Sequence, residues 1–410
     1  MSASYQNNHY VPVWYQKRFI PSESSEKALF YLDLEPGNFV DGKGIRRKRK
    51  DIRLLGPRHC FVQKDLYRTG LLGLAPTDIE QFFFGKIDER GKEAVAVFSN
   101  FEYKIGGNGS NFHDLLRYLS TQKLRTPKGL GWICDAFRAK SRDEVLTKMI
   151  DYQRLFCAIW TECVWQIAEA KDSDTKFIIS DHPVTVYNRE LGPRNQKCRG
   201  FNDPEIWLNG SHTLFPLSAE KILILTNLSW VRNPYQSAKA QRPHSNPLRD
   251  AMFMTCEVQT ERYLTENEVR QINFIIKKRA LRYVASGNKE WLFPEEHVSK
   301  SDWPRFGNGY LLMPEPRVLN FSTQTLIQYK SGRVDGFDEY GRRGVSDEAD
   351  EEAREKESRT LDQFKAEFAQ LIGRQRRGRT FEFGSLSDEE DCEMIHEYYL
   401  KLGNRSRDRR

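Results

Sequence analysis

Four ionisable side chains lie in polar motifs where a catalytic group could be placed: His9, Glu80, Arg125 and Asp181. Asp181 follows an apolar stretch typical of a β-strand, and the end of a strand is the usual position of carboxylates in sheet-based active sites. Its oxygens could hold Mg²⁺ or another divalent ion. The alternative is an Asp-His-Pro turn, in which Asp181 bonds the following backbone and Pro183 fixes the bend.

His9 and Tyr10 form a polar pair inside an otherwise apolar segment. An imidazole that titrates near neutral pH can act as a general base or bind a metal. Burying this pair without partners would be unfavourable, which indicates a function. The alternative is that both side chains anchor the N-terminal segment by hydrogen bonds and stacking. Tyr10 and His182, the neighbour of Asp181, are therefore secondary candidates.

Glu80 and Asp88 lie eight residues apart in a predicted helix. They project about 80° apart, so both could face one cleft and join Asp181 as metal ligands. Glu80 also completes a capping box with Thr77, which is a structural role. Arg125 precedes Thr-Pro at a predicted helix end, where it could clamp a phosphate or neutralise the helix C-terminus.

The net charge of +7 is unevenly distributed along the chain. One basic run consists of Arg46, Arg47, Lys48, Arg49 and Lys50. Such runs attract phosphate backbones by releasing counterions, although solvated loops carry them as well. We therefore expect the run at 46–50 to contact nucleic acid.

The remaining pattern predicts an α+β fold, in which one helix-rich domain surrounds a mixed, mostly antiparallel sheet. Predicted strands cover 28–34, 213–217 and 221–226, and two short strands within 176–187 are hinged at 181–183. Predicted helices cover 77–97, 112–124, 141–170 and 265–285, three of them opened by a capping box. We expect a core domain over 1–316. Residues 317–410 form a charged, partly helical C-terminal extension, which could bind a protein partner or mediate self-association.

Three short motifs carry a resemblance to a known family: Asn8-His9-Tyr10-Val11-Pro12, Leu124-Arg125-Thr126-Pro127 and Phe177-Ile178-Ile179-Ser180-Asp181-His182-Pro183-Val184. Together they resemble, over about residues 7–290, the family known as domain of unknown function 4238. This sequence has His182 where that family more often has Asn. The resemblance implies an effector of bacterial antiviral defence, and the C-terminal third lies outside it.

Bulk properties exclude several classes of protein. Hydrophobic residues make up 39% of the 410 and aromatic residues 12%, which permits a packed core and argues against global disorder. No apolar run approaches the ~20 residues that span a bilayer, and the first residues lack a secretory signal. The seven cysteines are scattered without a Cys-x-x-Cys pair, which is typical of reduced thiols. The sequence therefore predicts a cytoplasmic protein without a membrane partner.

Known catalytic motifs are also absent. No zinc-binding or Gly-x-Ser-x-Gly motif occurs. Residues 37–44 nearly form a phosphate-binding loop, but Gly44 replaces the Ser or Thr that would hold magnesium. We therefore predict no nucleotide cofactor.

These observations favour a nuclease-like effector, and the resemblance implies a setting in antiviral defence. Asp181, with Glu80 or Asp88, would bind a divalent ion that polarises a phosphodiester and activates water. His9 would transfer a proton, and Arg125 would stabilise charge on the phosphate. The alternative is a non-enzymatic module that senses nucleic acid or a phage component, with the same residues forming one buried network. Transfer chemistry on a nucleotide is a third hypothesis.

Overall fold

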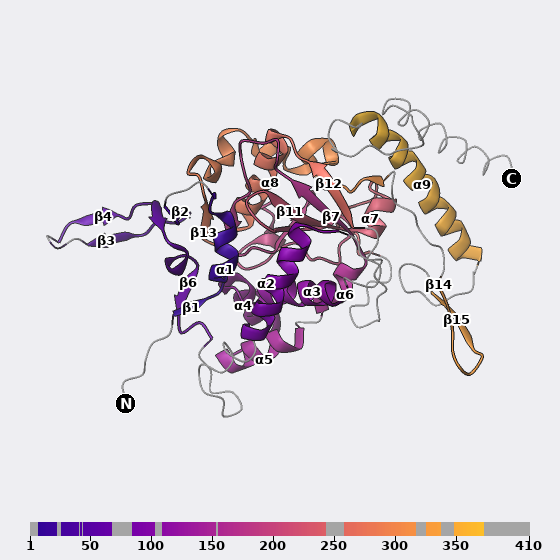
Figure 1. The fold of residues 1–410 in the computed structure, drawn as a ribbon, viewed down its shortest axis with the longest axis horizontal. Coiled ribbons are helices and arrows are strands. Elements are labelled where there is room, and N and C mark those ends of the chain that lie inside the picture. The colour runs from indigo at the N-terminus through magenta and orange to yellow at the C-terminus, as the bar shows by residue number, and fades with distance from the viewer. Residues whose placement is uncertain are drawn as a thin grey trace.

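The computed structural model describes residues 7–22, 26–40, 42, 44–67, 84–102, 109–152, 155–242, 258–316, 325–337 and 348–372. Helices surround a five-stranded sheet, and a four-stranded sheet lies beside it (Figure 1). This confirms the predicted α+β class. None of the described helices combines the length and the apolar character needed to cross a membrane.

The larger sheet is mixed and mostly antiparallel, as predicted. Its strands are β7 (Cys163–Glu169), β9 (Thr185–Asn188), β10 (Ser211–Pro216), β11 (Lys221–Asn227) and β12 (Gln259–Tyr263). They follow the order β12-β7-β11-β10-β9, and only the pair β12–β7 is parallel.

The smaller sheet contains β2 (Leu29–Asp33), β5 (Ile52–Leu55), β8 (Ile179–Ser180) and β13 (Tyr283–Ser286), all antiparallel in the order β5-β2-β13-β8. The two short strands predicted within 176–187 exist as β8 and β9, and the predicted hinge separates them. The sequence suggested one sheet for both strands, but β8 belongs to the smaller sheet and β9 to the larger one. The hinge therefore carries the chain from one sheet to the other.

Helices cover both faces of the larger sheet. On one side lie α2 (Gly85–Ser99), α3 (Gly109–Leu124), α4 (Pro127–Phe137), α5 (Arg142–Tyr152) and α6 (Leu155–Thr161), and on the other α8 (Glu266–Arg279). Alternation along β11 shows this: Leu223 and Leu225 pack in the cluster of the first helices, whereas Ile222 and Ile224 pack with α8. A strand buried on both faces reads as a continuous apolar run.

That property explains one wrong prediction. The helix expected over 141–170 ends with α6 at Thr161, and residues 163–169 form the central strand β7. A buried apolar run cannot be assigned to helix or strand from periodicity alone, and Val164, Trp165 and Ile167 are residue types that favour strands.

Helix α8 begins at the predicted capping box. The Glu268 backbone N–H donates to Thr265 Oγ1 (3.4 Å), and the Thr265 N–H donates to Glu268 Oε2 (2.9 Å). The helix ends at Arg279 rather than near 285, because β13 begins at Tyr283. The predicted capping box at 77–80 lies outside the described residues.

Small elements complete the fold. The N-terminal segment contains β1 (Asn7–His9) and α1 (Val13–Gln16), and β1 pairs with β6 (Val62–Lys64). Two further antiparallel ribbons occur. One consists of β3 (Asn38–Val40) and β4 (Arg46–Lys48), and the other of β14 (Thr325–Gln328) and β15 (Val334–Phe337). Among the described residues, 3₁₀ helices are η1 (Lys17–Phe19), η2 (Pro57–His59), η5 (Gln196–Cys198), η7 (Glu290–Leu292), η8 (Pro294–Glu296) and η9 (Lys300–Gly309).

The C-terminal extension contains α9 (Glu348–Ile372), which lies along α7 (Leu228–Arg232) (Figure 1). Phe364 and Phe368 of α9 are fully buried in one cluster with Trp230 of α7. The Phe364 ring stacks on Tyr310, with the ring centroids 5.7 Å apart. This helix is therefore packed against the edge of the core.

Candidate functional site

The turn between β8 and β9 places Asp181 in a structural role. Its carboxylate accepts hydrogen bonds from the backbone N–H groups of Leu281 (2.9 Å), Arg282 (2.7 Å) and Tyr283 (2.9 Å). Burial raises the pKa of Asp181, against the three N–H groups that lower it. The side chain fastens the turn to the segment between α8 and β13. The turn interpretation expected Asp181 to bond the backbone that directly follows it, but its partners lie about 100 residues further along the chain.

His9 and Asp181 do not meet. The His9 ring lies in β1, where Nε2 donates to the Arg58 carbonyl oxygen (3.0 Å). The neighbouring Tyr10 is buried, and its carbonyl oxygen accepts a hydrogen bond from the Gln122 amide (2.9 Å). Burial raises the pKa of Tyr10, and nearby Tyr31 and Asp181 add to this effect. Tyr10, rather than His9, is therefore the residue of this motif that lies in the electrostatic environment of Asp181.

Arg125 forms a separate buried cluster. Its Nη1 lies 2.8 Å from Asp88 Oδ1, its Nε donates to Gln122 Oε1 (2.8 Å), and its guanidinium lies over the rings of Phe84 and Tyr118. Burial opposes the charge, but Asp88 together with Tyr118 and Tyr67 outweighs it, so the pKa of Arg125 is raised. Arg125 and Asp88 thus neutralise each other. Glu80 lies outside the described residues.

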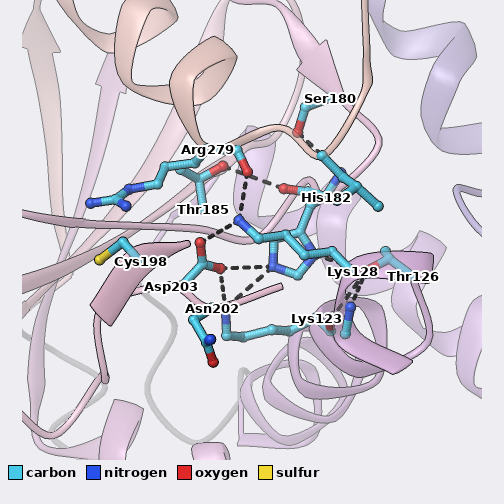
Figure 2. Close-up of polar contacts among 12 residues, drawn as sticks. Lys123, Thr126, Lys128, Ser180, His182, Thr185, Cys198, Asn202, Asp203 and Arg279 are labelled. Carbon is cyan, nitrogen blue, oxygen red and sulfur yellow. Dashed lines mark hydrogen bonds and ion pairs between the residues drawn. The ribbon is translucent and has the colours of Figure 1, made fainter. Parts of the chain in front are cut away.

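His182, the secondary candidate, lies at the centre of another polar cluster (Figure 2). Its Nε2 is 3.0 Å from Asp203 Oδ2, and its Nδ1 is 2.8 Å from Thr126 Oγ1. The same carboxylate pairs with two ammonium groups, Lys123 Nζ at 3.1 Å and Lys128 Nζ at 2.5 Å. Three cationic or potentially cationic groups therefore converge on a single carboxylate.

The charge states in this cluster follow from its burial. Burial lowers the pKa of His182 to about 4, and the adjacent Lys123 ammonium adds to the shift. The imidazole is therefore neutral at pH 7. Burial opposes the charge of Asp203, but Lys128 and Lys123 outweigh it and hold the pKa of Asp203 well below its usual value. Burial also lowers the pKa of Lys123, against the attraction of Asp203.

Hydrogen bonding assigns the tautomer of His182. Nε2 faces the Asp203 carboxylate, so it carries the ring hydrogen, and Nδ1 then accepts from the Thr126 hydroxyl. This hydroxyl–imidazole–carboxylate order is that of a nucleophile relay. However, Thr126 is fully buried, and its Oγ1 accepts the Gly129 N–H (3.1 Å) as the N-cap of α4. We therefore assign Thr126 to capping α4 and orienting the imidazole.

The cluster forms the floor of a small cavity of about 40 Å³. Lys123, His182 and Asp203 line its polar side, and the exposed Glu205 also lines it. Four aromatic side chains form the remaining walls: Trp132, Phe156, Phe201 and Trp207. Because one water needs about 10–15 Å³, the hollow has room for a group of phosphate size.

Close packing shapes one of these walls. A Cβ added to Gly131 of α4 would lie 2.5 Å from the Phe201 ring. Glycine at this position therefore allows the ring to lie against the helix. Phe201 precedes Asp203 by two residues, so the packing of its ring against α4 also positions the Asp203 carboxylate.

The predicted metal site finds little support in this geometry. In the part of the chain that the structure describes, no three His, Cys, Asp or Glu side chains lie close enough together to hold a metal ion. The oxygens of Asp181 are used by backbone N–H groups, and Asp88 is paired with Arg125. The basic residues at 46–50 lie in and beside β4 and are absent from the cavity lining.

Sequence reasoning missed Lys123, Lys128 and Asp203. One signal was available: Lys128 lies in the first turn of α4, where the helix dipole disfavours a cation. A lysine at such a position indicates a nearby carboxylate. Asp203 gave no comparable signal, because Asn202-Asp203-Pro204 reads as an ordinary turn.

Comparison with known proteins adds one finding. No curated protein and no solved structure matches this chain. The aligned region of the family model contains Asp181, His182 and Asp203, whereas His9 and Arg125 precede it. Over residues 133–290 the chain is similar to the family described as protein of unknown function (DUF4238).

Proposed function

We propose that this protein binds nucleic acid and holds one nucleotide unit at the cavity beside His182. One observation carries the proposal: two buried ammonium groups, Lys123 and Lys128, share the Asp203 carboxylate, and Lys123 and Asp203 line a hollow walled by aromatic rings. Lys123, Lys128 and Asp203 together carry one net positive charge that an anion can balance, and the exposed Glu205 also lines the hollow. A pocket with aromatic walls, a few converging polar groups and shifted pKa values is typical of ligand sites.

Lys123 is the residue that we expect to contact the phosphate. It lines the cavity, and its side chain keeps 10% of its surface exposed. Lys128 is more enclosed and also donates to the Arg279 carbonyl oxygen (2.7 Å). Charge-assisted hydrogen bonds to phosphate oxygens are shorter and stronger than neutral ones. Lys123 would thus bind the ligand, while Lys128 holds Asp203 in place.

The aromatic walls suit a nucleobase. Trp132 and Trp207 are only partly buried, so they can present ring surface at the mouth of the hollow. Stacking of a base on an aromatic side chain contributes about 1–3 kcal/mol and tolerates any base. A phosphate in the hollow and a base against the rings would together recognise a nucleotide unit without strong sequence preference.

Nuclease-like cleavage at this site is the second candidate function. The observation that favours it is a neutral imidazole and an ammonium group at the same wall of the cavity. General acid–base catalysis by such groups contributes about 10²–10⁴-fold to a rate. Cleavage would need the other tautomer, in which Nδ1–H donates to Thr126 Oγ1 and Nε2 is free to accept. Water would form the new bond to phosphorus and release its proton to Nε2, while the bond from phosphorus to the leaving oxygen breaks and that oxygen takes a proton from Lys123. No step through a metal ion is proposed.

The biological setting is part of the same proposal. The resemblance carried by the N-terminal and Asp-His-Pro motifs supports a role in antiviral defence in the cytoplasm. Viral nucleic acid would then be the natural ligand. The packed helix α9 would leave the rest of the C-terminal extension for a protein partner or a second copy of the chain.

Ligand binding is tested by quenching of tryptophan fluorescence with nucleoside monophosphates, nucleosides and inorganic phosphate. We expect monophosphates to bind the wild-type protein more tightly than nucleosides. Lys123→Met should weaken binding at least 10-fold, whereas Lys300→Met, a change at an exposed lysine outside the cavity, should leave it unchanged. Equal binding by both variants would refute the proposed site.

Cleavage is tested with labelled RNA and DNA strands, with Mg²⁺ or with a chelator. His182→Asn keeps a polar amide beside Thr126 but cannot take up a proton. If cleavage occurs here, this variant should bind strands normally and cut them about 10²-fold more slowly. Unchanged cutting by the variant would exclude His182 as the base, and strand binding without cutting by wild type would favour the binding module.

A further inference from the structure

The ribbon formed by β3 and β4 projects from the body of the protein (Figure 1). Its two strands pair in antiparallel register, with Phe39 opposite Arg47 and Val40 opposite Arg46. Opposite residues of such a pair lie on the same face of the ribbon. Each face therefore carries at least one apolar and one cationic residue.

Charge on this ribbon is strongly positive. Residues 38–50 contain six basic residues and one acidic residue, Asp41. Arg46, Arg47, Arg49 and Lys50 are exposed. This density of cations on one narrow element fits a polyanion much better than a neutral surface.

Apolar side chains are exposed beside these cations. Val40 is 66% exposed, Ile45 51% and Phe39 40%. Val40 and Ile45 flank the turn, so the apolar surface lies at the outer end of the ribbon. Proteins that read the major groove of DNA use apolar side chains in this way, against the thymine methyl groups.

We propose that the β3–β4 ribbon is an arm that enters the major groove of double-stranded DNA. The major groove of DNA is about 12 Å wide and admits a two-stranded ribbon. Arg46 and Arg47 leave opposite faces of the ribbon, so they can reach the phosphates on the two walls of the groove. This deepens the proposed function, since it rests on nucleic acid as the ligand and names the duplex as the form that the arm recognises.

The arm and the cavity have different tasks in this arrangement. The cavity fits a single nucleotide whose base is free to stack on aromatic rings. The ribbon fits a paired duplex, whose bases are unavailable for such stacking. Nucleic acid with a junction between paired and unpaired segments would satisfy both sites.

The arm is tested by measuring duplex affinity as a function of salt concentration. The ribbon variant Arg46→Gln/Arg47→Gln/Arg49→Gln is compared with Lys289→Gln/Lys300→Gln/Arg305→Gln, which removes the same charge from exposed positions elsewhere. Each lost phosphate contact lowers the salt slope by about 0.9, so three contacts correspond to about a 100-fold loss at 0.15 M salt. We expect that loss for the ribbon variant and a much smaller one for the control.

Further measurements separate this inference from the proposed function. The ribbon variant should keep its melting temperature and its binding of nucleoside monophosphates, because it leaves the cavity intact. Val40→Ser/Ile45→Ser should weaken duplex binding without changing the salt slope.

Equal duplex affinities of the ribbon and control variants would refute the proposal that the ribbon binds the duplex. So would tighter binding of single strands than duplexes through the ribbon, or capture of vesicles containing phosphatidylserine in place of DNA. If Lys123→Met lost monophosphate binding and the ribbon variant kept its duplex affinity, the arm would be refuted and the proposed cavity site would be supported.

Discussion

The junction of α3 and α4 supplies two buried basic clusters that differ in charge balance. Arg125 faces Asp88 one to one, is 1% exposed, and is enclosed by aromatic rings. Lys123 and Lys128 share Asp203, and the cluster opens into a cavity. The basic residues Lys123, Arg125 and Lys128 lie within six positions of one another, yet Arg125 forms a closed ion pair and the two lysines border a cavity.

The difference shows why charge alone is a poor guide to function. A neutral, enclosed ion pair has nothing left to offer a ligand, and removing one partner mainly destabilises the fold. A cluster with surplus charge beside a hollow can gain from binding an anion. The four predictions below separate the two clusters, in order of decreasing effect.

Replacing Asp203 by Ala should have the largest effect on stability. It leaves two buried ammonium groups and an imidazole without their common acceptor. We expect a loss at the upper end of about 3–5 kcal/mol in the free energy of unfolding, measured by urea denaturation. Added nucleoside monophosphate or phosphate should recover part of this loss, since an anion can replace the carboxylate. A decrease in the free energy of unfolding below about 1 kcal/mol would contradict the role of Asp203 as the common acceptor of this cluster.

Replacing Arg125 by Met should lower the free energy of unfolding by about 3 kcal/mol, the lower end of the same range. The reason for the smaller effect is that Asp88 keeps 26% of its side chain exposed and can regain water. Phosphate should give no recovery. The control Arg90→Ala, at a 64% exposed residue of α2, should change stability by less than about 0.5 kcal/mol. Rescue of Arg125→Met by phosphate would show that both clusters bind anions.

Acid should destabilise the protein through its buried histidines. Their pKa values are about 4 for His182 and about 3 for His212, below the usual value of about 6.5 that applies in the unfolded chain. Below pH 6.5 the unfolded state therefore binds more protons, so stability falls as the pH drops from 6.5 towards 4. His182→Asn should remove about 1.4 kcal/mol per pH unit from that slope, measured by urea denaturation between pH 7 and 4.5. An unchanged slope would mean that His182 is already accessible to protons.

Replacing Trp207 by Ala should affect binding more than folding. The loss of one stacking surface corresponds to about 1–3 kcal/mol of binding free energy for a nucleotide. Nucleoside monophosphates should lose affinity accordingly, whereas inorganic phosphate should bind as before, and calorimetric titration measures both. Phosphate affinity that falls in parallel would indicate that the ring shapes the hollow instead of stacking on a base.

Much of the fold could be predicted from the sequence. The capping box of Thr265 and Glu268, the hinge at 181–183 and the alternating helices and strands gave the α+β class, because these signals act over a few neighbouring residues. The Asp-His-Pro motif was also recognised as important, but Asp181 and His182 had to be weighed by residue type alone. The existence of β7, which was predicted as helix, and the division of β8 and β9 between two sheets were beyond such local signals.

The sequence by itself determined which local motifs form turns, caps and basic runs, because short-range sterics and hydrogen bonding suffice for these. Only the tertiary structure decided that Asp181 bonds backbone N–H groups, that Arg125 pairs with Asp88, and that Lys123, Lys128 and Asp203 meet at His182. Each of these outcomes depends on which distant segment supplies a partner, and on whether water reaches the pair. A side chain carries the same charge in every fold, but its partner and its burial determine what that charge can do.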